Sequence, residues 1–479
     1  MRVDFGVDFG TTNSACVGII NGERLLKFED QYDGSPFPSL VIIDPTTGQV
    51  FCGREAWMKR QEYSEHCEVI ASVKTFLGTG KKWRIAGKTW TPEMVAAEVF
   101  KGLKKQVAAT GGKLEMKEAV VAVPVGFAPE KRAELRRAAN RAGIEIQSFV
   151  SEPTAAFFRH NEEIGFYHRI GVVDWGGGTL DVSIIENSNE LIKELATGGV
   201  NLGGDNIDLK LAQWVHNRVV QEKRAAVSFE EMPSAARDML LARCERAKKD
   251  LQFRDVVELT LLKYGDLGSF RIPLDIDTFT RLIGREIQQA IDCFEDTLKR
   301  ARLSMDELGC ILMVGGSVNL RPFVEEVEGI WPCEKIYPED ADWSVARGAG
   351  SLSMNPGHYL LAETIGMIMS DESFYPLLKE GYRVTHEPVA FTFALVEDSS
   401  TANFIFSDQN RHILGYMNVP AFGFFQEKID LEAIIDKDLV FRVTARSQHR
   451  SDRYTGEWSY PGPALYYRLP ARLEVAVGG

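Results

Sequence analysis

The sequence predicts an α/β protein of two lobes, followed by an all-β sandwich. Strand and helix patterns alternate over residues 1–356, which is typical of α/β folds. Two similar glycine-rich hairpins, one at Asp8 and one at Asp174, indicate that the second lobe repeats the plan of the first. Beyond residue 356 the hydrophobic period falls to two, as expected for half-buried antiparallel strands.

Composition is that of a soluble globular protein, with 44% hydrophobic and 26% charged residues. The net charge of −13 argues against binding to nucleic acid, because such binding depends on basic residues. No apolar run approaches the ~20 residues that span a bilayer, and the first residues do not form a signal peptide. We therefore expect a cytoplasmic protein with no membrane partner. The seven scattered cysteines fit reduced thiols, and Cys16 is either a buried apolar residue or redox-sensitive.

The two hairpins have the composition of phosphate-binding loops. Residues 7–14 read VDFGTTNS and residues 172–181 read VVDWGGGTLD, each with an acid at the end of a strand. Consecutive glycines can leave backbone N–H groups free for phosphate oxygens, and carboxylates suit the magnesium that accompanies a nucleotide. Taken alone, either hairpin could be a plain glycine turn. Two copies favour a nucleotide clamped between two lobes, and the absence of a Walker pattern argues against a P-loop NTPase.

The remaining elements of the first lobe follow from periodicity and helix signals. Lys74 stands among apolar residues, a pattern that by itself favours a surface lysine with a packed stem. Glu152 and Pro153 open a helix directly after a strand. The other predicted elements are a strand at 37–43, a helix from Pro92 to about 108, a strand at 119–125, a helix that starts at Pro129 and ends before Gly143, and a strand at 144–150.

The second lobe contains two further glycine clusters. One lies at 197–205 and leads into a helix at 207–222, and the other, at 315–317, follows a strand at 310–314. The charged helix predicted at 235–252 is either a solvated amphipathic helix or a helix whose edge contacts a ligand. A long helix at 278–302 and a small-residue helix at 346–350 complete the lobe.

Five motifs, in this order and spacing, resemble the DnaK-type chaperones of the 70-kDa heat shock protein family. They are 8–14 (DFGTTNS), 152–156 (EPTAA), 174–181 (DWGGGTLD), 202–205 (LGGD) and 314–317 (VGGS). The resemblance covers residues 1 to about 356 and is looser beyond. It implies an actin-like ATPase with a duplicated ribonuclease-H-like fold, divided into lobe I (1–168) and lobe II (169–356). A linker (357–363) and a peptide-binding sandwich (364–479) without the family's helical lid would follow.

The resemblance also implies roles for individual residues. Asp8 and Asp174 would hold magnesium through its waters. Lys74 would lie beside the γ-phosphate, position the attacking water and offset charge, which reverses the surface interpretation of this lysine. Glu152 and Asp181 would orient the water or complete the magnesium shell, so that the catalytic set is Lys74, Glu152, Asp174 and Asp181. The expected nucleotide-binding residues are Gly10, Thr11, Thr12, Asn13, Gly176, Gly177, Gly178, Thr179, Gly203, Gly204, Asp205, Glu245, Lys248, Lys249, Gly315, Gly316, Ser317 and Asp342.

Further roles concern the sandwich and its partners. Pro124 and Arg132 match the family's relay between nucleotide site and linker, and Phe374, Val396 and Asn403 fall at peptide-pocket positions. The implied cofactors are ATP or ADP with Mg²⁺, and K⁺ as a further ion. The implied partners are an unfolded or extended polypeptide, a J-domain cochaperone and a nucleotide exchange factor.

Several positions depart from the family pattern. Val318 and Asn319 stand where the family places an arginine against adenine, and Gln252 replaces a serine at the base. These changes predict an altered nucleotide affinity or base preference. Ser148 replaces an arginine used for J-protein docking, and the linker segment 359–363 (YLLAE) lacks the family's Asp and Pro. Both changes weaken the expectation of coupling to a J-domain partner.

The leading hypothesis is an ATP-hydrolysing chaperone that binds extended polypeptide and acts in protein folding and the stress response. ATP binding would dock the sandwich on the lobes, and hydrolysis would release it. The alternative is a nucleotide-switched scaffold or regulatory adaptor with one dedicated protein partner. A small-molecule kinase or a filament-forming protein of the same superfamily is disfavoured by the 152–154 signature and by the β-rich tail.

Overall fold

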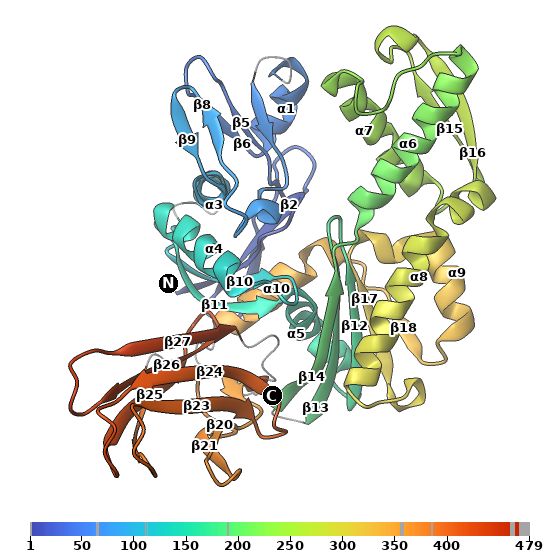
Figure 1. The fold of residues 1–479 in the computed structure, drawn as a ribbon. Helices are drawn as coiled ribbons and strands as arrows, with labels where there is room; N and C mark the ends of the chain where they lie inside the picture. The colour runs from blue at the N-terminus through green and yellow to red at the C-terminus, as the bar shows by residue number, and fades with distance from the viewer. Residues whose placement is uncertain are drawn as a thin grey trace, which may run out of the picture.

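The computed structural model describes residues 2–63, 67–110, 112, 114–188, 191–354, 359–384, 387–459 and 465–468. Two α/β lobes stand side by side, and a β-sandwich lies below the first of them (Figure 1). We call the lobe that contains the N-terminal strand lobe I and the other lobe II. No helix in these ranges is long and apolar enough to cross a membrane.

Lobe I is built on a sheet with the strand order β11-β10-β1-β2-β3. The first three of these strands are parallel, whereas β2 and β3 continue the sheet in antiparallel fashion. Most of the strand residues are buried, as expected for strands covered by helices. The bounds are β1 Val3–Asp8, β2 Asn13–Ile20, β3 Arg24–Lys27, β10 Glu118–Val123 and β11 Glu145–Ser151, with helices α3 Pro92–Thr110 and α4 Pro129–Arg141.

Lobe II repeats this sheet strand for strand. Its first five strands follow the order β18-β17-β12-β13-β14, with the same parallel and antiparallel relations. The predicted duplication is therefore confirmed, because β12 corresponds to β1 and β13 to β2. The bounds are β12 Arg169–Trp175, β13 Leu180–Ser188, β14 Leu191–Val200, β17 Cys310–Val314 and β18 Glu334–Ile336, with helices α8 Ile276–Arg300 and α9 Arg321–Ile330.

Two helices, α5 Glu152–Ile164 and α10 Ala341–Ser353, lie between the sheets and hold the lobes together. Their small residues permit a very close approach. A Cβ atom at Gly348 would lie 1.6 Å from the Ala155 carbonyl oxygen, and one at Gly6 would lie 2.1 Å from Gly350 N. The glycines of α10 therefore allow it to pack directly on α5 and β1, which brings the ends of β1 and β12 close together.

Each lobe carries an outer part beyond its sheet. In lobe I the two-residue strand β4 Phe37–Pro38 still pairs with β2 of the sheet. The outer part consists of β5 Val41–Ile43, β6 Val50–Cys52, α1 Arg54–Tyr63, β7 Glu68–Ile70, α2 Val73–Phe76, β8 Trp83–Ile85 and β9 Lys88–Trp90. In lobe II it consists of α6 Gly204–Lys223, α7 Ser234–Asp250, β15 Val256–Leu261 and β16 Phe270–Asp275. Short helical turns lie at η1 Gly265–Leu267, η2 Met305–Glu307 and η3 Gly316–Asn319.

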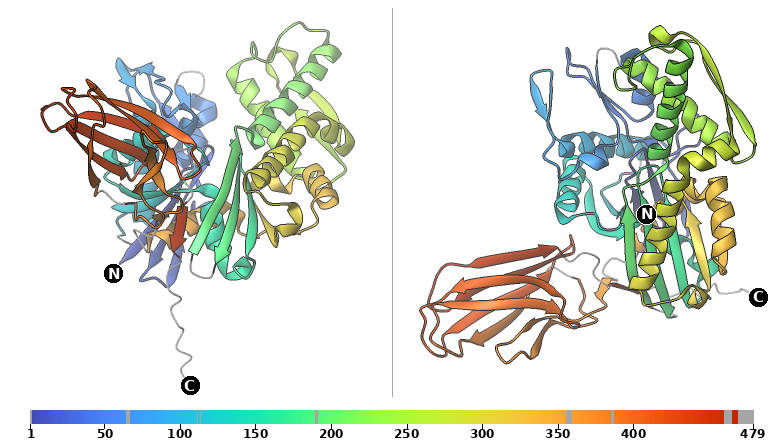
Figure 2. Two further views of the ribbon diagram at one scale, coloured as in Figure 1. Left: turned by 60° about the horizontal axis from the view of Figure 1, so that its bottom comes forward. Right: turned by 45° about the vertical axis from the view of Figure 1, so that its right-hand side comes forward.

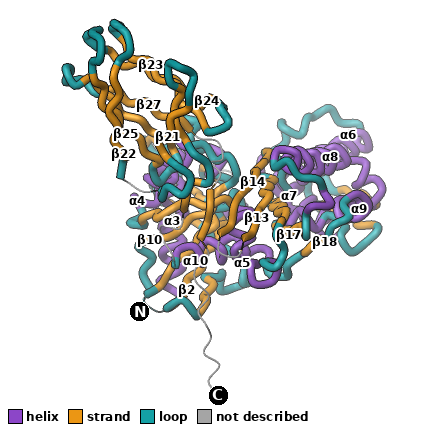
Figure 3. Tube along the Cα trace, turned by 90° about the horizontal axis from the view of Figure 1, so that it is seen from below, coloured by secondary structure: helices purple, strands orange, loops and turns teal. Residues whose placement is uncertain are grey.

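The C-terminal region forms a sandwich of two four-stranded sheets, with orders β21-β20-β23-β24 and β22-β25-β26-β27. The predicted alternation in 389–394 is confirmed, since Val389, Phe391 and Phe393 are the half-buried residues of β22. The sandwich lies against the α4 side of lobe I, as Figures 2 and 3 show from other directions. The bounds are β20 Ile365–Ile368, β21 Phe374–Leu378, β22 Val389–Ala394, β23 Thr401–Asp408, β24 Ile413–Pro420, β25 Lys428–Ile435, β26 Val440–Ser447 and β27 Tyr454–Ser459.

Two short strands extend the sheet of lobe II. β28 Leu465–Arg468 pairs with β14, and β19 Tyr359–Leu361 pairs with β28, which completes a seven-stranded sheet. Part of the predicted linker 357–363 is thus a strand, and residues 357–358 lie outside the described ranges. Within the range predicted for the sandwich, residues 465–468 belong to the sheet of lobe II.

Candidate functional site

The two predicted phosphate loops face each other across the junction of the lobes. A Cβ atom at Gly178 would lie 2.9 Å from Thr11 Oγ1, and one at Gly177 would lie 3.0 Å from Thr12 Oγ1. Thr12 Oγ1 also donates to Asp205 Oδ2 at 3.4 Å. Because the loops follow equivalent strands of the two lobes, the duplication itself brings them together.

The third and fourth glycine clusters complete this region. The backbone N–H of Gly204 donates to Gly176 O at 3.0 Å, and Ser317 Oγ donates to the same oxygen, also at 3.0 Å. Gly203 must lack a side chain, since a Cβ there would lie 2.1 Å from Gly177 O. Gly315 has a φ of +84°, and its Cβ would meet Asp174 Oδ1 at 2.8 Å. All four glycine segments therefore converge on one small volume.

A buried ion pair lies beside the loops. Lys74 Nζ donates to Glu152 Oε1 at 2.5 Å, and their side chains are only 5% and 10% exposed. Lys74 lies in α2 and Glu152 is the first residue of α5, so the pair joins the outer part of lobe I to the inter-lobe helix. Asp181 is close by, with Oδ1 accepting from Val125 N at 2.7 Å and Oδ2 without a hydrogen-bond partner among the described residues.

The carboxylates around this pair resist ionisation. Burial, followed by the charge of Glu152, raises the pKa of Asp8 to about 7 and that of Asp181 to about 8. The same two causes raise the pKa of Asp174. Burial opposes the charge of Lys74, but the charges of Glu152, Asp8 and Asp181 raise its pKa overall. The cluster thus contains more carboxyl groups than the charge of Lys74 can balance, and these groups keep their protons to a higher pH than usual.

This electrostatic balance fits a divalent cation. A Mg²⁺ ion prefers oxygen ligands, usually keeps several waters, and would relieve the repulsion among the buried aspartates. Among the described residues, no group of three or more His, Cys, Asp or Glu side chains is placed to hold a metal. A hydrated ion, which Asp8 and Asp174 would hold through its waters, is compatible with these residues.

The residues expected at the nucleoside lie around α7 and α10. Glu245 and Lys249 form an ion pair of 2.7 Å, and Asp342 acts electrostatically on both Lys249 and Asp8. Lys248 is buried and donates to Asp208 Oδ2 at 2.7 Å and to Gly204 O at 3.1 Å. Its ammonium therefore secures the start of α6. Asn13 and Gly316 begin β2 and η3, directly after the loops, and Thr179 directly follows Gly178.

The sandwich contacts lobe I through a buried arginine. Arg136 of α4 donates from Nε to Asp438 Oδ1 at 2.8 Å and from Nη2 to Lys437 O at 3.2 Å. The predicted relay residue Arg132 lies one turn earlier, and its Nε has no hydrogen-bond partner within the described ranges. Burial lowers the pKa of Arg132, and the charges of Asp438 and Asp436 oppose this effect. Pro124 directly precedes Val125, the backbone donor to Asp181.

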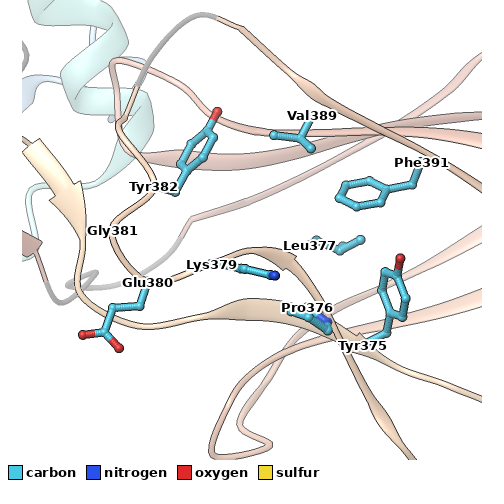
Figure 4. Close-up of a pocket in the computed structure, with 9 residues that line it drawn as sticks. All are labelled: Tyr375, Pro376, Leu377, Lys379, Glu380, Gly381, Tyr382, Val389 and Phe391. Atoms are coloured by element: carbon cyan, nitrogen blue, oxygen red, sulfur yellow. The ribbon is translucent and has the colours of Figure 1, made fainter.

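The sandwich has an open edge with a cavity of about 560 Å³ between β21 and β22. The rings of Tyr375 and Phe391 lie at one end and Tyr382 at the other (Figure 4). The centroids of the first two rings are 6.2 Å apart. The lining residues are Tyr375, Pro376, Leu377, Lys379, Glu380, Gly381, Tyr382, Val389 and Phe391.

None of the three predicted pocket residues lines this cavity. Phe374 is half-buried at the start of β21, Val396 is 66% exposed in the loop after β22, and Asn403 is exposed opposite Asn418. Sequence reasoning also missed Val125, Asp208 and Arg136. For Arg136 no signal existed, because it lies in the middle of α4 and its partner Asp438 is 302 positions away.

The fold and the paired glycine loops define a two-lobed, actin-like nucleotide-binding protein followed by a β-rich region. The sequence profile described as "Hsp70 protein" matches residues 79–354, more than half of the chain. The chaperone protein DnaK of Mycoplasmopsis pulmonis (strain UAB CTIP) is 30% identical over 361 residues, which cover 73% of this chain and 57% of that protein. The chain belongs to the Hsp70 family. It is a distant relative of DnaK and spans little more than half of that protein's length.

The raised carboxyl pKa values predict an unusual dependence of stability on pH. Asp8 and Asp181 ionise near pH 4 when unfolded but near 7 and 8 when folded, so the folded chain binds more protons between these values. The free energy of unfolding of the metal- and nucleotide-free protein should therefore fall as the pH rises from about 5 to 8. The thermal midpoint in EDTA measures this. In Asp181→Asn the thermal midpoint should depend less steeply on pH. An equally steep pH dependence in that variant would contradict the raised pKa of Asp181.

Proposed function

We propose that this protein hydrolyses ATP between its lobes with the help of Mg²⁺ and uses its sandwich to bind extended polypeptide under nucleotide control. The observation that carries the proposal is the convergence of the Thr11–Thr12 and Gly177–Gly178 loops beside the Lys74–Glu152 pair. Members of the Hsp70 family are typically ATPases, and their nucleotide-binding fold is the one found here.

In this proposal the chain's residues act mainly by positioning and charge, as is usual in phosphoryl transfer. Thr11, Thr12 and the 176–178 backbone surround the phosphates. Lys74 holds the attacking water and offsets charge on the γ-phosphate, and Glu152 keeps the Lys74 ammonium in place. Asp181 orients the water through Oδ2, while Val125 fixes its other oxygen. When bound, magnesium supplies positive charge at the phosphates.

The sandwich supports the second half of the proposal. The open edge between β21 and β22 offers aromatic and aliphatic side chains together with exposed strand edges, which suits an extended peptide. The Arg136–Asp438 contact ties the sandwich to lobe I, and in this proposal it passes a change between the lobes to the sandwich. The boundaries 1–356, 357–363 and 364–479 are our proposal for the functional units, with the exception of residues 465–468, which join the sheet of lobe II.

The adaptor function is the second candidate. It is favoured by the cavity lining, because none of the family-type pocket positions Phe374, Val396 and Asn403 contributes to it. A cavity lined by other residues than the family's peptide pocket would select a ligand other than generic peptides, such as one dedicated protein partner.

One experiment separates the two candidates. Steady-state ATP hydrolysis by the intact chain is measured with and without an unfolded apolar peptide, with Lys74→Ala as the blank. If peptide raises a Lys74-dependent rate several-fold, the chaperone function stands. A Lys74-dependent rate that no peptide changes would contradict that function and favour the adaptor.

A further inference from the structure

β28 connects the sheet of lobe II to the linker strand. Ile192 of β14 is the register partner of Tyr467 on one side, and Tyr359 of β19 is its partner on the other. The linker strand β19 is in turn hydrogen-bonded to the sandwich, because Leu361 N donates to Tyr382 O at 2.8 Å. A strand from beyond the sandwich therefore completes a hydrogen-bonded connection between lobe II, the linker and the sandwich.

The two tyrosines of β28 point in opposite directions, as neighbours in a strand must. Tyr466 lies on the sandwich side, where its hydroxyl donates to Glu380 Oε1 at 2.8 Å. Tyr467 is only 1% exposed and belongs to the core between the lobes, with its ring 5.3 Å from Phe158 of α5. The Tyr467 hydroxyl donates to Glu194 Oε2 at 3.2 Å.

Glu194 joins Tyr467 to the start of α5. This buried carboxylate on β14 accepts at Oε1 from Ser151 Oγ at 2.7 Å, from Thr154 Oγ1, and from Ser183 Oγ at 3.3 Å. Ser151 occupies the N-cap position of α5, but its hydroxyl bonds Glu194 and makes no cap bond. Glu194 thus holds the residues on both sides of the Glu152-Pro153 pair.

The contacts form one continuous chain from the C-terminal strand to the catalytic centre. Tyr467 bonds Glu194, Glu194 holds Ser151 and Thr154, and between these two lies Glu152, which pairs with Lys74 at 2.5 Å. The Tyr467–Glu194, Thr154–Glu194 and Lys74–Glu152 links are buried and the Ser151–Glu194 bond is partly buried, so competing water weakens the chain little. A hydrogen bond to a buried carboxylate fixes that carboxylate's position, and the loss of one donor lets it move.

We propose that Tyr467 and Glu194 are positioning residues for Glu152, and that the strand Leu465–Arg468 thereby acts as a built-in effector of the ATPase. With β28 in its place beside β14, Glu194 is held and Glu152 keeps Lys74 correctly placed. Release of the strand frees Glu194 and slows hydrolysis. The proposal rests on the ATPase function proposed above.

The test uses Tyr467→Phe in the full chain, which removes the hydroxyl and keeps the buried ring. Single-turnover hydrolysis should slow by about three- to tenfold, because a hydrogen bond to a charged group is lost at a distance from the reaction. The dissociation constant for ATP should stay within twofold of wild type, which also shows that both lobes are folded. Tyr466→Phe is the matched control, with the same change on the same strand, and should hydrolyse ATP at close to the wild-type rate.

The double variant Tyr467→Phe/Glu194→Gln tests the path through Glu194. If both residues act through one hydrogen bond, the double variant is no slower than Glu194→Gln alone. The inference is overturned if Tyr467→Phe hydrolyses ATP at the wild-type rate, if Tyr466→Phe slows it equally, or if the two effects multiply. Each of these results would contradict the role of Tyr467 but not the proposed ATPase activity. The absence of Lys74-dependent ATP hydrolysis in the wild type would contradict the proposed function itself.

Discussion

Lys74→Ala is expected to lower the rate of ATP hydrolysis by about 10²–10³-fold, the usual cost of losing a charge-stabilising group. The ammonium is buried beside Glu152, and its charge opposes part of the rise in the pKa of Asp8, Asp174 and Asp181. In the proposed function the glycine loops supply most of the phosphate contacts, so ATP affinity should change only a few-fold. Single-turnover rates and equilibrium binding, measured on the same preparation, separate the two quantities.

The control for this experiment is Lys101→Ala. Lys101 is 46% exposed on α3 and pairs with Glu98 on the surface, so its loss should leave hydrolysis unchanged. The thermal midpoint of Lys74→Ala must be recorded too, because the variant leaves Glu152 buried without its partner. Retention of more than a third of the wild-type rate by a folded Lys74→Ala protein would contradict the role given to this lysine.

Arg136→Ala is expected to release the sandwich from lobe I. The guanidinium is 8% exposed and bonds both the Asp438 carboxylate and the Lys437 carbonyl, and breaking a buried pair by removing one partner costs about 3–5 kcal/mol. Hydrogen exchange measures the effect. Amides of the loop 436–439 and of β11 should exchange faster, because Arg136 donates hydrogen bonds to Asp438 in this loop and to Ile146 O in β11.

Arg137→Ala provides a neighbouring control in the same helix. Arg137 is 57% exposed and pairs with Glu93, and such surface pairs contribute about 0–1 kcal/mol. Its exchange pattern should match the wild type at the loop and at β11. Equal exchange in the two variants would show that the Arg136–Asp438 pair does not hold the sandwich in place.

Much of the fold could be predicted because its signals are local. The hairpins at Asp8 and Asp174 each combine an apolar strand, an acid and a glycine turn within ten residues, and their likeness predicts the duplicated sheets. Small errors at helix ends have local causes as well. The long helix predicted at 278–302 spans Ile276–Arg300, because Asp275 caps it by accepting from Thr278 N and Arg302 has a φ of +58°.

The parts that could not be predicted depend on contacts between distant segments. β28 is four residues long and pairs with strands that lie far away in the chain, so neither periodicity nor turn residues reveal it. The partner of Lys248 is Asp208, 40 positions away, on a helix whose packing no sequence pattern specifies. For Glu194 the sequence does not show that the side chain is buried. An acid in a strand reads as a surface residue until the structure places it among Ser151, Thr154 and Tyr467.

The most direct test of the central claim, that the two loops hold the phosphates of one nucleotide, is calorimetric titration of the intact chain with ATP and with AMP. Both titrations are run with Mg²⁺ and repeated in EDTA. We expect one ATP per chain, tighter binding with Mg²⁺ than without it, and AMP binding weaker by at least tenfold, because AMP lacks the phosphates that the loops surround. Equal affinity for AMP and ATP, or no ATP binding at all, would contradict the account.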